Sequence, residues 1–173
     1  MDSFLNGPQG VKIWEKALSN EWGRLSQGNI YGVQPSDTIT FVNHHEVPKS
    51  NAVTYESFVC DHKPLKSEPW RVRLVVGGDK LDYNPDAGSP ASDLTETKIL
   101  LNSVISDAHK GAKFLSCDIK DFFLATPMET PEYMKVPIKF FPQDIQDKYH
   151  LQDLVHNDGY VYIRINKGMY SLK

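Results

Sequence analysis

The spacing of apolar residues near the start of the chain predicts an amphipathic helix. Five apolar side chains recur at intervals of three and four residues, which places them on one helical face. They are Val11, Trp14, Leu18, Trp22 and Leu25. We therefore predict a helix over residues 11–25 that ends before Gly28, with both tryptophans packed in the core.

From position 38 the pattern changes to short runs in which apolar and polar residues alternate. The runs Thr38–Val42, Val53–Cys60 and Arg71–Val76 are rich in β-branched and aromatic residues, and Pro or Gly separates them. This pattern is typical of strands joined by turns. Gly77-Gly78 closes the third run but lacks the spacing of a phosphate-binding glycine loop.

A second helix is predicted after the Pro-containing stretch at 84–90. Ser92 or Asp93 can cap it, it runs to about His109, and Gly111 ends it. Its apolar residues predict a core element. A strand is expected next at 114–119, where Asp118 ends an otherwise apolar run.

The last fifty residues predict a short helical segment at 122–124 and a strand around Tyr133–Val136. A short helix near Pro142 and a strand at Tyr160–Ile165 follow, and the turn before that strand is Asn157-Asp158-Gly159. Strands and helices do not alternate strictly. The fold class expected is therefore α+β, with an antiparallel or mixed sheet and packed helices.

Composition narrows the class of protein. The 173 residues carry a formal net charge of −3, so any contact with nucleic acid has to come from a local cluster of Lys and Arg. Cys60 and Cys117 stand far apart, which favours buried, reduced cysteines over a zinc site. No signal peptide and no apolar run of ~20 residues is visible, so we expect a soluble, intracellular protein without a membrane partner.

Asp118 and Asp121 are candidate ligands for a metal ion. Carboxylates presented at the end of a strand suit Mg²⁺, a hard cation that bridges to phosphates. Taken alone, however, an Asp at this place is more typical of a cap or turn. His44-His45 is predicted to be a solvent-exposed loop and not a metal pair, because neighbouring strand residues point to opposite faces.

Arg71 and Arg73 alternate along the third predicted strand and so share one of its faces. Guanidinium groups match phosphate oxygens, which makes the pair a candidate clamp for a triphosphate, with Lys66 as a weaker third member. The competing interpretation is an exposed edge strand that is protected by its charges. Which of the two arginines makes the main contact stays open.

Four segments resemble copia-type retrotransposon reverse transcriptases. FLSCDIKDFFLATPM is similar to the first catalytic motif, in which an aspartate ends a palm strand and an aromatic residue follows five positions later. WRVRLVVGGDKLDY, PEYMKVP and NKGMYSLK are similar to three further runs of that family, in the same order. The resemblance covers residues 51–173, which implies fingers and a partial palm. Residues 1–50, an N-terminal helix and connecting segment, match only loosely.

This resemblance implies an RNA-directed DNA polymerase with part of a right-hand polymerase fold. It implies that Asp118 is catalytic and binds two Mg²⁺ ions with help from the Ile119 carbonyl. Phe123 would be the gate that rejects a ribose 2′-hydroxyl, since burying that group without a partner costs ~1–3 kcal/mol. The incoming deoxynucleotide would also contact Lys66, Arg71, Arg73, Asp121 and Phe122, with Lys173 at the edge of its site. The partners implied are an RNA or DNA template–primer and a deoxynucleoside triphosphate.

The sequence also departs from the family. It has no Asp-Asp pair, which the family uses to complete the carboxylate set, and it ends at Lys173. We therefore expect weak Mg²⁺ binding, no activity from these residues alone, and self-association through an open palm edge. The alternatives are a nucleic-acid-binding or protein-binding relic without catalysis and a pseudogene product without function.

Overall fold

The computed structural model describes residues 8–81, 92–117, 122–170 and 172. The chain divides into two compact units, which are described separately. Unit 1 comprises residues 1–82 and 121–172, and unit 2 comprises residues 83–120 together with residue 173.

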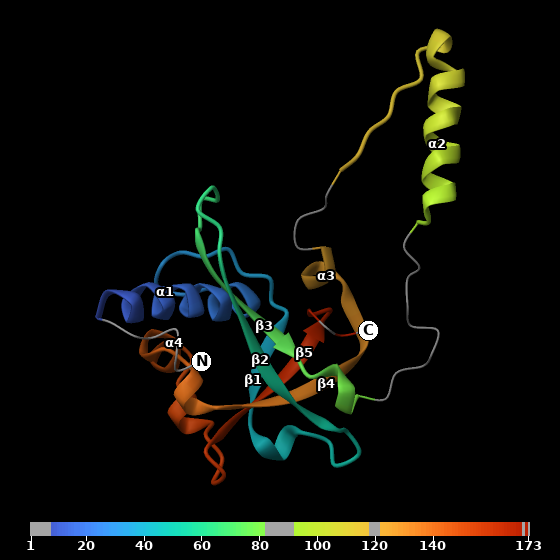
Figure 1. Ribbon diagram of the computed structural model, residues 1–173. Helices are drawn as coiled ribbons and strands as arrows, with labels where there is room; N and C mark the ends of the chain where they lie inside the picture. The colour runs from blue at the N-terminus through green and yellow to red at the C-terminus, as the bar shows by residue number, and fades with distance from the viewer. Residues whose placement is uncertain (1–7, 82–91, 118–121, 171, 173) are drawn as a thin grey trace. The chain divides into compact units, whose positions relative to one another are not determined.

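Unit 1 is built on a mixed sheet of five strands in the order β1-β5-β4-β2-β3 (Figure 1). The strands are β1 (Ile39–Val42), β2 (Val53–His62), β3 (Trp70–Val76), β4 (Pro127–Pro137) and β5 (Tyr160–Lys167). The β2–β4 pair is parallel and the other pairs are antiparallel. The α+β class and a mixed sheet are thus confirmed, and each predicted strand of unit 1 is present.

Strand β2 is shared between two neighbours along its length. Its first residues, Val53–Tyr55, pair with Tyr133–Lys135 of β4, whereas Glu56–His62 pair with β3. The β2–β3 hairpin therefore extends beyond the part of the sheet that β4 covers (Figure 1). In its outer half β2 pairs only with β3, so this part of the hairpin depends on other elements for support.

Helix α1 (Pro8–Leu25) supplies that support, since it packs against β3. The predicted helix is confirmed and begins three residues earlier than expected. Trp22 and Leu25 are fully buried. The Trp22 ring lies 4.3 Å from that of Phe141 between centroids, and its Nε1 donates a hydrogen bond to the Phe140 carbonyl at 3.1 Å. Trp14 is half-buried and meets the Trp70 ring edge-on at 5.1 Å.

The core of unit 1 lies along β4 and β5. Val161, Ile163 and Ile165 of β5 are fully buried, as are Met134 and Val136 of β4. The remaining helical elements of unit 1 are short. They are α3 (Phe122–Ala125), α4 (Gln143–Lys148) and the 3-10 helices η2 (His44–Glu46), η3 (Gly78–Lys80), η5 (Ile138–Phe140) and η6 (Leu151–Asp153). Among the described residues, no helix combines the length and apolar character that crossing a membrane requires.

In unit 2, α2 (Leu94–Ser106) is followed by the 3-10 helix η4 (Ala108–Lys110). Asp93, and not Ser92, is the N-cap: its carboxylate accepts from the Glu96 N–H at 2.8 Å, and the Glu96 carboxylate accepts from the Asp93 N–H at 3.1 Å. This reciprocal pair satisfies two backbone donors that the first turn leaves open. Gly111 follows with φ of +84°, the left-handed conformation that glycine adopts without strain.

Three expectations for unit 2 are wrong. No residue of α2 is buried, because the described part of this unit has no second long element that could cover its apolar side chains. Residues 114–117 form no strand, since no described strand pairs with them and an unpaired strand leaves its backbone groups unsatisfied. Cys117, within that segment, is exposed, whereas Cys60 in β2 is half-buried; both are free thiols.

The exposed apolar residues of unit 2 predict that the 173-residue polypeptide associates as its concentration rises. Ile105 is 72% exposed and Leu115 is 85% exposed, and exposed apolar surface promotes association. The double variant Ile105→Lys/Leu115→Lys should lower the weight-average mass in sedimentation velocity at a given concentration. The control, Asn102→Lys/Ser116→Lys, adds the same charges at exposed polar positions and should leave association unchanged. A wild-type protein that stays monomeric at every concentration contradicts this prediction.

Candidate functional site

The β2–β3 hairpin carries the predicted anion-binding residues. Arg71 and Arg73 lie on one face of β3, opposite Asp61 and Val59 of β2 respectively. Arg73 is exposed and Arg71 is half-buried. Lys66 is exposed in the turn between the strands, where its N–H donates to the Lys63 carbonyl at 3.0 Å. The hairpin thus presents all three cations on its accessible parts.

The opposite face of β3 fixes the direction of the arginines. Val72, Leu74 and Val76 are buried at 3%, 0% and 1% exposure, on the side where α1 packs. Because successive strand residues point to opposite faces, burial of these three side chains turns Arg71 and Arg73 away from α1. The alternation read from the sequence is therefore confirmed, and its cause is the apolar face beneath.

Glu21 of α1 binds the free edge of β3. Its Oε1 accepts a hydrogen bond from the Leu74 N–H at 3.1 Å, and its Oε2 accepts from Arg24 Nη1 at 2.8 Å. Arg24 Nη2 also donates to Glu68 at 2.9 Å. Burial raises the pKa of the Glu21 carboxyl more than the Leu74 hydrogen bond and the Arg24 charge lower it. The carboxylate satisfies an edge N–H that could otherwise recruit another strand.

The segment after β5 joins two parts of unit 1 that are distant in sequence. The Gly168 N–H donates to the Thr126 carbonyl at 2.9 Å, and the Val76 N–H donates to the Tyr170 carbonyl at 3.2 Å. Met169 between them is 2% exposed. Residues 168–170 therefore bridge the end of β3 and the start of β4, where the residues after α3 lie.

The Arg73 side chain contacts the same segment. Its guanidinium carbon lies 5.4 Å from the centroid of the Tyr170 ring, within the range of a cation–π interaction. Sequence reasoning placed Tyr170 in a family-like run but assigned no role to it. Nothing in the local pattern could have revealed this contact, because it depends on the path of the chain after β5.

Helix α3 holds the end of the predicted catalytic segment against the sheet. Leu124 is 1% exposed, and its carbonyl accepts a hydrogen bond from Thr38 Oγ1 at 3.1 Å. Phe122 and Phe123 lie in this single helical turn, as predicted. The remaining predicted site residues, Asp118, Ile119, Asp121 and Lys173, lie outside the described residues.

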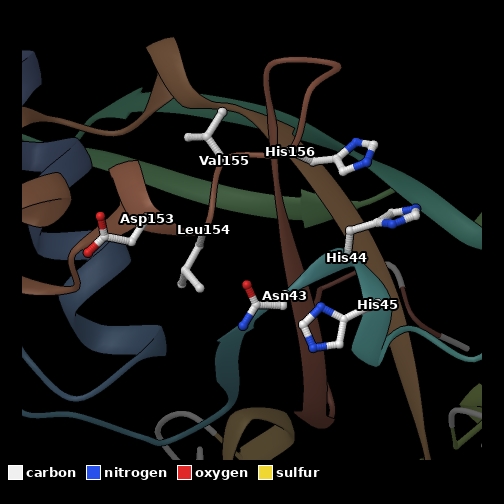
Figure 2. A pocket seen from close by; sticks show the side chains of 7 residues that line it. All are labelled: Asn43, His44, His45, Asp153, Leu154, Val155 and His156. Carbon is white, nitrogen blue, oxygen red and sulfur yellow. The ribbon is translucent and has the colours of Figure 1, made fainter.

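A second cluster of polar side chains lies at the other end of β5. This region has a hollow of about 250 Å³, and Figure 2 shows the side chains that line it: Asn43, His44, His45, Asp153, Leu154, Val155 and His156. His44 and His45 are exposed, as predicted, although they lie in a 3-10 helix and not in a loop. The His44 ring stacks on that of His156 with 4.1 Å between centroids, and the His45 ring is turned away from that pair.

Asp158 contacts three side chains near the His44–His156 stack: Tyr162, Lys135 and His156. It accepts a hydrogen bond from Tyr162 OH at 3.0 Å and lies 3.5 Å from Lys135 Nζ. His156 Nδ1 is 3.2 Å from Asp158 Oδ1, a separation that suits an ion pair, but the geometry is not that of a hydrogen bond. Burial raises the pKa of Asp158, while its hydrogen bonds and Lys135 lower it by more. Within the described part of the chain, no group of three or more His, Cys, Asp or Glu residues can hold a metal ion.

No protein-family model, curated protein or solved structure matches this chain. The resemblance to copia-type reverse transcriptases therefore stays a prediction. The structure shows how the segments that resemble this family are arranged. Two of them, the β2–β3 hairpin and residues 168–170, are in contact.

The raised pKa of Glu21 predicts an unusual dependence of stability on pH. A carboxyl whose pKa is higher in the folded state than its ordinary value of 4.5 binds more protons when folded. Its contribution to the free energy of unfolding is therefore largest below pH 4.5 and is lost as the pH rises through the folded pKa. In Glu21→Gln this contribution to the pH dependence of the free energy of unfolding should be absent. Urea unfolding curves recorded at a series of pH values measure it.

The matched control for this prediction is Glu15→Gln, an exposed glutamate of the same helix. Its curve of unfolding free energy against pH should run parallel to that of the wild type. The prediction fails if the Glu21→Gln curve also runs parallel to the wild type across this range.

Proposed function

We propose that residues 51–173 form the fingers and the first part of the palm of a copia-type reverse transcriptase, an RNA-directed DNA polymerase. The observation that carries this proposal is the bridge made by residues 168–170. It joins β3, which bears the candidate triphosphate clamp, to the residues that follow α3, which bears the candidate sugar gate. Segments predicted to serve one nucleotide are thereby brought into one unit of the fold.

The geometry of the β2–β3 hairpin supports this function. The hairpin extends past the rest of the sheet. The face of β3 that is turned away from α1 carries Arg71 and Arg73, and Lys66 lies in the turn. Three cations on one projecting element suit a flexible polyanion such as a triphosphate, which guanidinium groups bind through paired N–H donors.

Each remaining role in the proposal belongs to a residue of the resembling motif. Asp118 and the Ile119 carbonyl would hold Mg²⁺, and the backbone of Asp121 and Phe122 would lie under the triphosphate. Phe123 would exclude the ribose 2′-hydroxyl, so that the product is DNA. When bound, Mg²⁺ neutralises phosphate charge and stabilises the attacking and leaving oxygens of the transfer.

The competing interpretation of the arginines, an edge strand protected by charge, meets one contrary observation. The edge N–H of Leu74 is already bound by Glu21, so this part of β3 is protected by a buried carboxylate. Two arginines on the hairpin face contribute little further protection of that edge. Anion binding therefore accounts better for Arg71 and Arg73 than edge protection does.

Loss of the arginines should weaken binding of a nucleotide. Charge-assisted hydrogen bonds contribute about 1.5–3 kcal/mol, which corresponds to roughly 10- to 100-fold in affinity. Arg71→Ala/Arg73→Ala should lower the affinity for thymidine triphosphate with Mg²⁺ by at least about tenfold in isothermal titration calorimetry. Arg164→Ala, which removes an exposed arginine from β5, is the control and should bind as the wild type does. Equal affinities for the wild type, the double variant and Arg164→Ala would contradict the proposed role of Arg71 and Arg73 in binding the triphosphate.

The same 173-residue polypeptide should not extend a primer. It contains no Asp-Asp pair, so the carboxylates that complete a two-metal site are missing from these residues. Incubation with a primer–template duplex, the four deoxynucleotides and Mg²⁺ should leave the primer length unchanged on a denaturing gel. Extension that Asp118→Asn abolishes would contradict this expectation. Salt-sensitive binding of the duplex without any triphosphate binding would instead favour the non-catalytic relic.

A further inference from the structure

Arg71 and Arg73 share a strand face but have different surroundings. Arg71 is half-buried and lies directly across the strands from Asp61, whereas Arg73 is exposed and lies across from Val59. Because Arg73 is the more exposed of the two, its guanidinium is the better placed to receive a phosphate group.

Two carboxylates that interact electrostatically with Arg73 are already bound by other cations. Asp61 lies 3.1 Å from Lys63 Nζ, and Glu21 lies 2.8 Å from Arg24 Nη1. Within the described part of the chain, Arg73 forms no ion pair of its own. This sets Arg73 apart from Arg24 and Lys63, each of which is paired with a carboxylate.

Tyr170 gives the Arg73 side chain a fixed partner. The guanidinium lies over the Tyr170 ring at 5.4 Å from its centroid. The Tyr170 backbone is itself held, because its carbonyl accepts the Val76 N–H at 3.2 Å and the neighbouring Met169 is buried at 2% exposure. An arginine side chain loses about 2 kcal/mol of rotamer entropy when it is ordered. A ring that orders it in advance lowers this cost when an anion binds.

A cation–π contact leaves the donors of a guanidinium in place. The N–H bonds of the planar group lie in its plane and point outward. Phosphate oxygens can therefore bind donors of Arg73 that the Tyr170 ring does not cover. The ring also lies in the segment that is hydrogen-bonded to Thr126, which follows α3.

We propose that Tyr170 is a positioning residue that holds the Arg73 guanidinium for the triphosphate of a nucleotide, so that Arg73 and not Arg71 makes the main phosphate contact. This inference rests on the proposed function and names the residue that organises its anion site. It also couples the hairpin to the segment after β5, because Arg73 belongs to the hairpin and Tyr170 belongs to that segment.

The test compares the affinity of single variants for thymidine triphosphate with Mg²⁺ and for inorganic tripolyphosphate, by calorimetry. Tyr170→Leu and Arg73→Ala should each weaken binding of both probes about fivefold or more, and Tyr170→Phe should stay within about twofold of the wild type. Arg71→Ala should lose less than Arg73→Ala. Tyr160→Leu, which removes the ring under Lys135, is the matched control and should not change binding.

A double-variant cycle separates positioning from a general loss of structure. If Tyr170 acts through Arg73, then Arg73→Ala/Tyr170→Leu binds no more weakly than Arg73→Ala alone. Replacing Tyr170 by pentafluorophenylalanine keeps the shape of a phenyl ring but removes its attraction for a cation, so binding should fall relative to Tyr170→Phe. This second comparison decides the matter even if Tyr170→Leu does not fold.

The outcomes distinguish this inference from the function on which it rests. Full additivity of the two substitutions, equal binding by the two phenyl rings, or a larger loss in Arg71→Ala each overturn the inference alone. Failure of the folded wild-type protein to bind either probe overturns both the inference and the proposed function.

Discussion

The pairing of β5 with β1 and β4 is the constraint on which the rest of unit 1 depends. Three side chains of β5 are fully buried, so the strand has one register in which its apolar residues stay in the core. That register fixes where the chain leaves the sheet after Lys167. Residues 168–170 can then reach both Thr126 and Val76, and the candidate site takes its geometry from a buried strand that carries none of its chemistry.

Electrostatics in this unit is organised locally, in keeping with a net charge of only −3. Two carboxylates near the hairpin have partners: Glu21 binds Arg24 and an edge N–H, and Asp61 binds Lys63. Among the described residues, Arg71 and Arg73 on the hairpin face take part in no ion pair. A protein that is slightly acidic as a whole can in this way present a small basic surface without attracting nucleic acid everywhere.

Local pattern predicted most of the elements of unit 1, because apolar spacing of three to four or of two reports which face is buried. It identified α1, the five strands, α4 and the alternation of Arg71 and Arg73. It failed at 114–117 and at the burial of α2, where the outcome depends on whether another element is present to pair or to pack. It also could not find the Glu21–Leu74 and Arg73–Tyr170 contacts, since each joins residues that only the tertiary fold brings together. The metal ligands suggested by the resemblance, Asp118 and Ile119, lie outside the described residues and stay predictions.

The central claim is that the hairpin face and the segment after β5 form one nucleotide site. The most direct measurement is a map of backbone amide shifts by ¹⁵N NMR as thymidine triphosphate with Mg²⁺ is added. The account predicts that the largest changes fall in Arg71–Val76, Phe122–Thr126 and residues 168–170. Changes centred instead on the histidine-lined hollow at His44–Glu46 and His156, or scattered over the surface lysines, would contradict it.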